Sequence, residues 1–118
     1  MSFIVMTLAT ILFFQGSWQA SSSEKVVNVT LTEWRIEMPG TLPAGPYNLK
    51  ITNSGKHSHT LKLKSEKFEV RLARNLDPGE SVELKIDLKP GVYRVYCPIG
   101  FAPLDHGNRG MELQLNVS

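Results

Sequence analysis

The segment Tyr96–Val117, YCPIGFAPLDHGNRGMELQLNV, contains the residues that most strongly suggest a fold and a chemistry. It includes the only cysteine of the chain, Cys97, and eight residues separate this cysteine from His106. Four more residues separate His106 from Met111, where an alternation of apolar and polar residues begins. Such alternation is typical of a half-buried β-strand. The segment therefore predicts a thiol, an imidazole and a thioether around one loop between two strands.

Thiolate, imidazole and thioether groups are a donor set typical of copper, and one more histidine would complete a site of two histidines, one cysteine and a weak axial methionine. The chain has three histidines, and the other two, His57 and His59, lie in the loop NSGKHSHTL at residues 53–61. Each candidate alone has an ordinary explanation, because free cysteine and methionine are common core residues. Their grouping at two loop ends favours a metal site.

From residue 26 onward, alternation predicts short β-strands. The alternating segments lie at residues 26–36, 47–52, 59–64, 68–72, 82–88, 93–97 and 111–117. Turn residues such as Asp77-Pro78-Gly79 and Pro90-Gly91 separate them. No segment has the period of an amphipathic helix of useful length. The pattern predicts an all-β protein, an antiparallel Greek-key β-sandwich, with Cys97, Met111 and His59 on inward faces.

Length and charge limit the other possibilities. The 118 residues are expected to form one domain, and the formal net charge of +2 comes without a block of like charge. We therefore expect no nucleic-acid partner, which would require a clustered basic face. A single cysteine also excludes an intrachain disulfide.

The N-terminus differs from the rest of the chain. Residues 1–23 carry no charged side chain, and residues 3–14 (FIVMTLATILFF) form an apolar run as long as the core of a signal peptide. We predict a signal peptide at residues 1–22 and a mature domain at residues 23–118 that is exported to a periplasmic or extracellular location. The mature chain would have no membrane span. An N-terminal strand or an uncleaved anchor is the alternative.

Two motifs together resemble the cupredoxin family of small blue-copper proteins. The first is an Asn-x-Gly turn followed by a histidine before an apolar strand, at residues 53–61. The second is Tyr-Cys-Pro, then His-x4-Met and an alternating last strand, at residues 96–117. The resemblance extends over about residues 25–118. The eight residues between cysteine and histidine exceed the two to four usual in small cupredoxins, and resemble the type 1 copper loop of copper nitrite reductases.

The resemblance implies one type 1 copper ion with His59, Cys97 and His106 as equatorial ligands and Met111 as the axial ligand. His57 remains a rival for the first histidine, and Asp105 could tune His106 or compete as a ligand. Those nitrite reductases carry a histidine beside the cysteine for a second, catalytic copper, and Tyr96 occupies that position here.

The implied function is therefore electron transfer by a monomer that is not an enzyme. Redox partner proteins would dock transiently near His106, where residues 99–104 supply an apolar rim, and Thr60 would brace the cysteine loop. Copper trafficking or storage with the same residues is one alternative. A metal-free β-sandwich interaction module is another.

Overall fold

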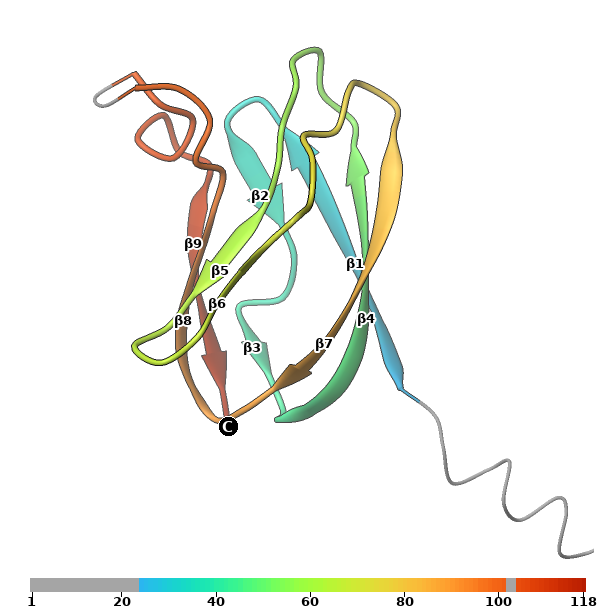
Figure 1. Cartoon of the computed structure of the whole chain (residues 1–118), viewed down its shortest axis with the longest axis vertical. Coiled ribbons are helices and arrows are strands. Elements are labelled where there is room, and N and C mark those ends of the chain that lie inside the picture. The colour runs from blue at the N-terminus through green and yellow to red at the C-terminus, as the bar shows by residue number, and fades with distance from the viewer. Residues whose placement is uncertain (1–23, 102–103) are drawn as a thin grey trace, which may run out of the picture.

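The computed structural model describes residues 24–101 and 104–118, and in them nine β-strands and no helix. The strands are β1 (Lys25–Thr32), β2 (Arg35–Glu37), β3 (Thr41–Leu42), β4 (Gly45–Asn53), β5 (Lys62–Lys64), β6 (Glu69–Arg71), β7 (Ser81–Leu88), β8 (Gly91–Tyr96) and β9 (Glu112–Val117). One sheet has the order β2-β1-β4-β7, and the other has the order β3-β9-β8-β5-β6. The two sheets form a sandwich, which confirms the predicted fold class (Figure 1).

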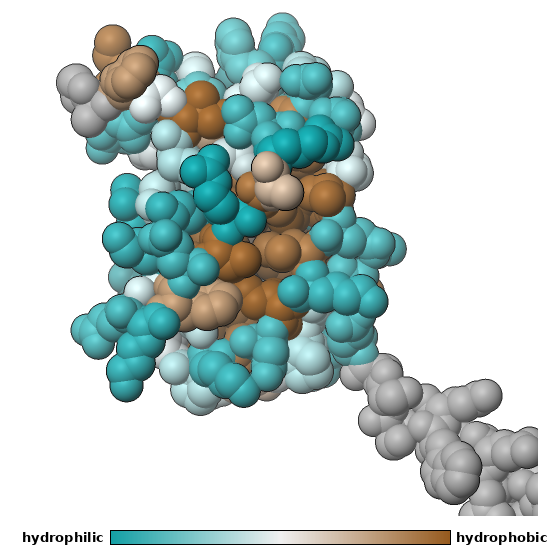
Figure 2. Space-filling model, in the orientation of Figure 1, coloured by the Kyte–Doolittle hydropathy of each residue, from teal (hydrophilic) through white to brown (hydrophobic). Residues whose placement is uncertain are grey.

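The core lies between the sheets and is built by the residues that the alternation predicted to face inward. On β4, Tyr47, Leu49 and Ile51 are buried, and on β8, Tyr93 and Val95 are buried. Burying one such side chain contributes about 1.5–3 kcal/mol. Figure 2 shows hydrophobic surface along the seam between the sheets, bordered by hydrophilic side chains. The hydrophobic alternation therefore positions the strand ends from which the candidate site is built.

The sequence predicted antiparallel pairing throughout, and this part of the prediction is wrong, because two strand pairs are parallel. β1 pairs with β4 in parallel, from Lys25 opposite Tyr47 to Leu31 opposite Asn53. β3 pairs with β9 in parallel as well. Between β1 and β4 the chain forms β2 at the edge of one sheet and then crosses to the other sheet as β3. Alternation reports which side of a strand is buried but not which strand lies beside it, so the parallel pairs were not visible in the sequence.

Two predicted strand segments are interrupted near the candidate site. The alternation at residues 26–36 is broken after Thr32 by a tight turn through Glu33 and Trp34, and β2 then folds back on β1. His59 lies outside β5 and forms an isolated bridge with Leu76, in which each backbone N–H donates to the other residue's carbonyl. The bridge still directs the His59 side chain into the core, where it is fully buried.

The β1–β2 turn, the segment between β4 and β5 and the segment between β8 and β9 lie at the same end of the sandwich (Figure 1). This end brings His57 and His59 near the segment that follows Cys97. Among the described residues no helix is long and apolar enough to cross a membrane. The predicted signal peptide at residues 1–22 lies outside the described residues, and its cleavage remains a prediction.

Candidate metal centre

Cys97 directly follows β8 and is fully buried. Its backbone N–H donates to the carbonyl of Met111 at 3.1 Å, which extends the β8–β9 ladder by one step beyond the last strand residues. Met111 is fully buried as well. The alternation of β8 and β9 therefore places the thiol and the methionine inside the same end of the sandwich, as the sequence predicted.

The segment between Cys97 and Met111 is closed by backbone hydrogen bonds despite its length. The N–H of His106 donates to the carbonyl of Ile99 at 2.8 Å, and the N–H of Met111 donates to the carbonyl of His106 at 3.0 Å. Asp105 accepts hydrogen bonds from the backbone and side-chain nitrogens of Asn108. The carboxylate of Asp105 thus stabilises a local turn and is not part of the cluster of candidate ligands.

Asn53 holds the segment that carries His59. Its Nδ2 donates to the carbonyls of His57 and Leu76 at 2.8 and 2.9 Å, and its Oδ1 accepts from the N–H of Gly55 at 2.9 Å. The buried amide side chain thereby fastens the turn to Leu76, the bridge partner of His59. This contact gives a physical reason for the Asn-x-Gly turn four to six residues before His59.

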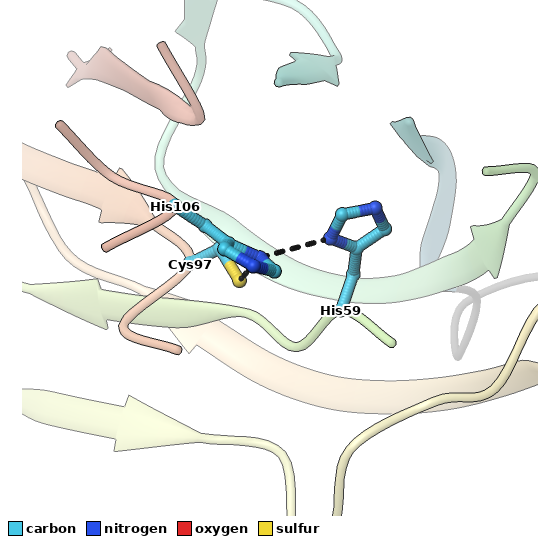
Figure 3. A group of neighbouring side chains, drawn as sticks. All are labelled: His59, Cys97 and His106. Carbon is cyan, nitrogen blue, oxygen red and sulfur yellow. Dashed lines mark hydrogen bonds between the residues drawn. The ribbon is translucent and has the colours of Figure 1, made fainter. Parts of the chain in front are cut away.

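Three ligand atoms converge at this end of the sandwich. The Nδ1 atoms of His59 and His106 are 3.3 Å apart, and the Sγ of Cys97 is 3.5 Å from the Nδ1 of His106. All three residues offer one ligand atom within 4.8 Å of the others. Figure 3 shows the two rings and the sulfur turned toward one another. His57, the rival first histidine, is exposed, and its ring stacks on Trp34.

Glu33 lies beside the nitrogen of His59 that faces away from His106. Its Oε1 is 3.5 Å from the buried Nε2 of His59, which makes no hydrogen bond among the described residues. The same oxygen accepts from the backbone N–H groups of Lys56 and His57 at 2.5 and 2.7 Å. A proton on Nε2 leaves the lone pair of Nδ1 directed toward His106. Carboxylates that orient metal-bound histidines in this way are a common feature of metal sites.

The electrostatics of the site favour neutral histidines. Burial lowers the pKa of His59, although Glu33 opposes this, and burial together with His59 and Arg109 lowers the pKa of His106. Desolvation raises the pKa of Glu33, but backbone hydrogen bonds and His59 outweigh it and lower that pKa to about 2. Neutral imidazoles are the form that binds a metal ion.

The thiol of Cys97 is held in its neutral form in the absence of a cation. Burial raises its pKa, and hydrogen bonds from the backbone of Thr60 and Ile99 oppose this effect. A bound metal ion reverses such a shift and deprotonates the thiol. Two imidazole lone pairs, a thiol and a buried methionine are chemically suited to a copper ion. The residues present therefore fit a copper ion, the metal that the sequence suggested.

Thr60 contributes in a different way from the one expected. Its side-chain hydroxyl donates to the carbonyl of Arg74 at 3.5 Å, while its backbone favours the Cys97 thiolate. Among the described residues the Thr60 hydroxyl thus bonds to the segment between β6 and β7, and bracing of the cysteine loop by this side chain is not observed.

Two residues of the site, Glu33 and Trp34, were not predicted from the sequence. They occupy the β1–β2 turn, and the ring of Trp34 lies 4.8 Å from that of His106, centre to centre. The available signal in the sequence was the end of the alternation after Thr32. Glu33, a charged residue, occupies the next position on the face that was expected to point inward.

The predicted apolar rim near His106 is present in the residues that the structure describes. Phe101 is 90% exposed and Leu104 is 67% exposed. Ala102 and Pro103 lie outside the described residues. Apolar residues this exposed beside a candidate redox site are suited to contact with another protein.

Comparison with known proteins supports the assignment of the fold. The sequence model of the cupredoxin-like domain matches residues 4–108. Auracyanin B has a TM-score of 0.64 and 17% identity over 82% of this chain and 91% of its own. Reduced auracyanin from Roseiflexus castenholzii has a TM-score of 0.60 and 12% identity over 82% of this chain and 99% of its own.

A reduced amicyanin variant has a TM-score of 0.55 and 13% identity, over 84% of this chain and 88% of its own. A search of curated proteins finds no match. At these identities the solved structures establish the shared fold, and the family match covers most of the sequence. The chain belongs to the cupredoxin family.

Proposed function

We propose that this protein is an electron carrier that binds one type 1 copper ion through His59, Cys97, His106 and Met111. The observation that supports this most strongly is the convergence of His59 Nδ1, Cys97 Sγ and His106 Nδ1 within 4.8 Å at one end of a cupredoxin sandwich. Two of these three side chains are fully buried. Buried soft and imidazole donors with no other function in the core favour a metal site over an accidental cluster.

Each residue has a distinct role in this proposal. His59 and His106 would supply neutral imidazoles, and Cys97 would supply the thiolate. Met111 would supply a weakly held thioether that tunes the reduction potential. A copper ion held there would supply one-electron chemistry by alternating between Cu(I) and Cu(II). The folded loops hold the donor atoms in one arrangement, so little rearrangement accompanies the change of charge.

Electron transfer without catalysis is favoured by the surroundings of the site. The residue beside Cys97 is Tyr96 rather than a histidine that could hold a second copper. The auracyanin and amicyanin to which the fold is similar are described in reduced form. Blue copper oxidase from Nitrosomonas europaea shares the fold too, with a TM-score of 0.59, but this chain covers only 39% of it.

We further propose that the protein is exported, with a signal peptide at residues 1–22 and the cupredoxin domain at residues 23–118, and acts as a monomer in a periplasmic or extracellular space. Redox partners would dock transiently on the loop beside His106, where Phe101 and Leu104 are exposed. Copper trafficking is less well supported, because a site for rapid metal exchange needs accessible ligands, and His59 and Cys97 are fully buried.

Matched histidine variants test the proposal. The wild-type protein loaded with Cu(II) should show an intense thiolate-to-copper absorption band that disappears with a mild reductant and returns with an oxidant. His59→Asn should abolish this band, and His57→Asn should retain it, because His57 is exposed and outside the cluster. Equal spectra for the two variants would contradict the ligand assignment. A Cys97→Ser protein that keeps the band would contradict the function.

A further inference from the structure

Trp34 has an unusual backbone conformation for a large side chain. It is the only non-glycine residue with a positive φ among those that the structure describes, at 129°. Residues with side chains rarely adopt this region because the Cβ atom collides with the backbone. Such conformations persist only where surrounding contacts stabilise them, and they often occur at functional sites.

The ring of Trp34 packs against both histidines of the candidate metal centre. Its ring packs edge-on against His106 at 4.8 Å and against His59 at 6.3 Å, measured between ring centres. On another side it stacks with His57 at 5.9 Å. The indole therefore lies against both imidazoles of the cluster and also against the exposed ring of His57.

Two neighbours hold Trp34 in this position. The guanidinium of Arg109 lies 4.6 Å from the centre of the indole ring, a cation–π contact. The backbone of Gly110 approaches the carbonyl of Trp34 so closely that an added Cβ would be 2.8 Å from that oxygen. The β1–β2 turn and the segment that carries His106 are thus packed together directly over the cluster.

We propose that Trp34 is a fixed cover that keeps water and small anions away from the metal position. This inference rests on the proposed function, since it assigns a role in a copper site. Metal sites that react with substrates keep a coordination position open, whereas closed sites have none. A bulky apolar ring against both histidines would hold this site closed, even though the positive charge of Arg109 attracts anions to the same surface.

The test compares azide binding by copper-loaded wild type, Trp34→Ala and Trp34→Phe. Azide should leave the spectra of wild type and Trp34→Phe unchanged. In Trp34→Ala it should produce an azide-to-copper band and weaken the thiolate band. Wild type that binds azide as tightly as Trp34→Ala, or a Trp34→Ala protein that excludes azide, would overturn the proposal. If Trp34→Ala does not fold, Trp34→Leu takes its place, and azide should bind to the copper of that variant in the same way.

A second readout needs no copper. Cys97 is the only thiol, is fully buried, and its Sγ lies 3.5 Å from Nδ1 of His106, the histidine against which Trp34 packs. Iodoacetamide should modify it slowly in metal-free wild type and Trp34→Phe, and at least about tenfold faster in Trp34→Ala, at temperatures well below unfolding. Equal rates of thiol modification in wild type and Trp34→Ala would overturn the proposal that Trp34 covers the site. A wild type that fails to become blue with copper but shows the difference in thiol reactivity would refute the proposed function and leave the cover supported.

Discussion

The Nδ1 atoms of His59 and His106 lie 3.3 Å apart although 46 residues separate them in the chain. One histidine precedes β5 and the other lies between β8 and β9, so only the folded sandwich brings them together. Glu33 lies near the other nitrogen of His59, which leaves its Nδ1 lone pair free to face His106. Two imidazoles in this arrangement suit a shared cation and disfavour protonation of both rings.

The first prediction concerns the pH dependence of the metal-free protein. Both histidines have pKa values below their ordinary 6.5 in the folded state, mainly through burial. The unfolded chain therefore takes up protons first as the pH falls through 6.5, and the free energy of unfolding should decrease from pH 7 to pH 5. Denaturant unfolding at a series of pH values measures this. The dependence of the unfolding free energy on pH should persist in His57→Asn and weaken in a His59→Asn/His106→Asn double variant. An unchanged pH dependence in the double variant would contradict the claim that these two histidines cause it.

The second prediction concerns Glu33. Glu33→Gln keeps an oxygen for the N–H groups of Lys56 and His57 but removes the negative charge beside His59. The charge favours Cu(II) over Cu(I), so its loss should raise the reduction potential. Loss of a partner that orients a metal-bound histidine should also weaken metal affinity, by about 10–100-fold. Potentiometry and copper competition measure both effects. Glu37→Gln, at an exposed position of β2, is the control, and equal effects of the two substitutions would refute the role of Glu33.

The third prediction concerns Met111, which is fully buried and whose backbone accepts a hydrogen bond from Cys97 and donates one to His106. Met111→Leu conserves volume and should cost less than about 1.5 kcal/mol of stability. Removal of the thioether should leave a blue protein with a higher reduction potential, because the weak axial ligand tunes the potential. Leu113→Met, two residues along β9, serves as the control. An unchanged potential in Met111→Leu would show that this methionine is only a core residue.

The fourth prediction concerns the packing of Gly110 against Trp34. Gly110 has a φ of +120°, and an added Cβ would approach the carbonyl oxygen of Trp34 to 2.8 Å. Gly110→Ala should therefore destabilise the protein by about 1–3 kcal/mol. Gly40→Ala should have a much smaller effect, since its added Cβ would have only one neighbour, at 3.9 Å. Thermal unfolding of both variants measures the difference. Equal losses of stability would contradict the close packing of Gly110 against the β1–β2 turn.

The sequence predicted the sandwich and the candidate ligands because both depend on local patterns. Alternation placed Cys97 and Met111 on inward faces, and the turn at Asn53 preceded a histidine that is indeed buried. Of the two rival histidines, His59 belongs to the cluster, and its role as a ligand stays a prediction. These features follow from the period of a β-strand and the chemistry of the donor atoms.

The contacts made by the β1–β2 turn could not be predicted in the same way. Glu33 and Trp34 reach the site from a strand end far away in sequence, and nothing in their local pattern reports the three histidines that they contact. The parallel pairing of β1 with β4 was hidden for the same reason. Tertiary proximity, rather than propensity, determines each of these features.

The most direct test of the central claim is the visible absorption spectrum of the purified protein with one equivalent of Cu(II). A type 1 site made by His59, Cys97, His106 and Met111 predicts an intense blue or green thiolate-to-copper band that a mild reductant bleaches reversibly. A pale spectrum with copper bound, or no copper binding at all, would contradict the claim that these residues form an electron-transfer centre.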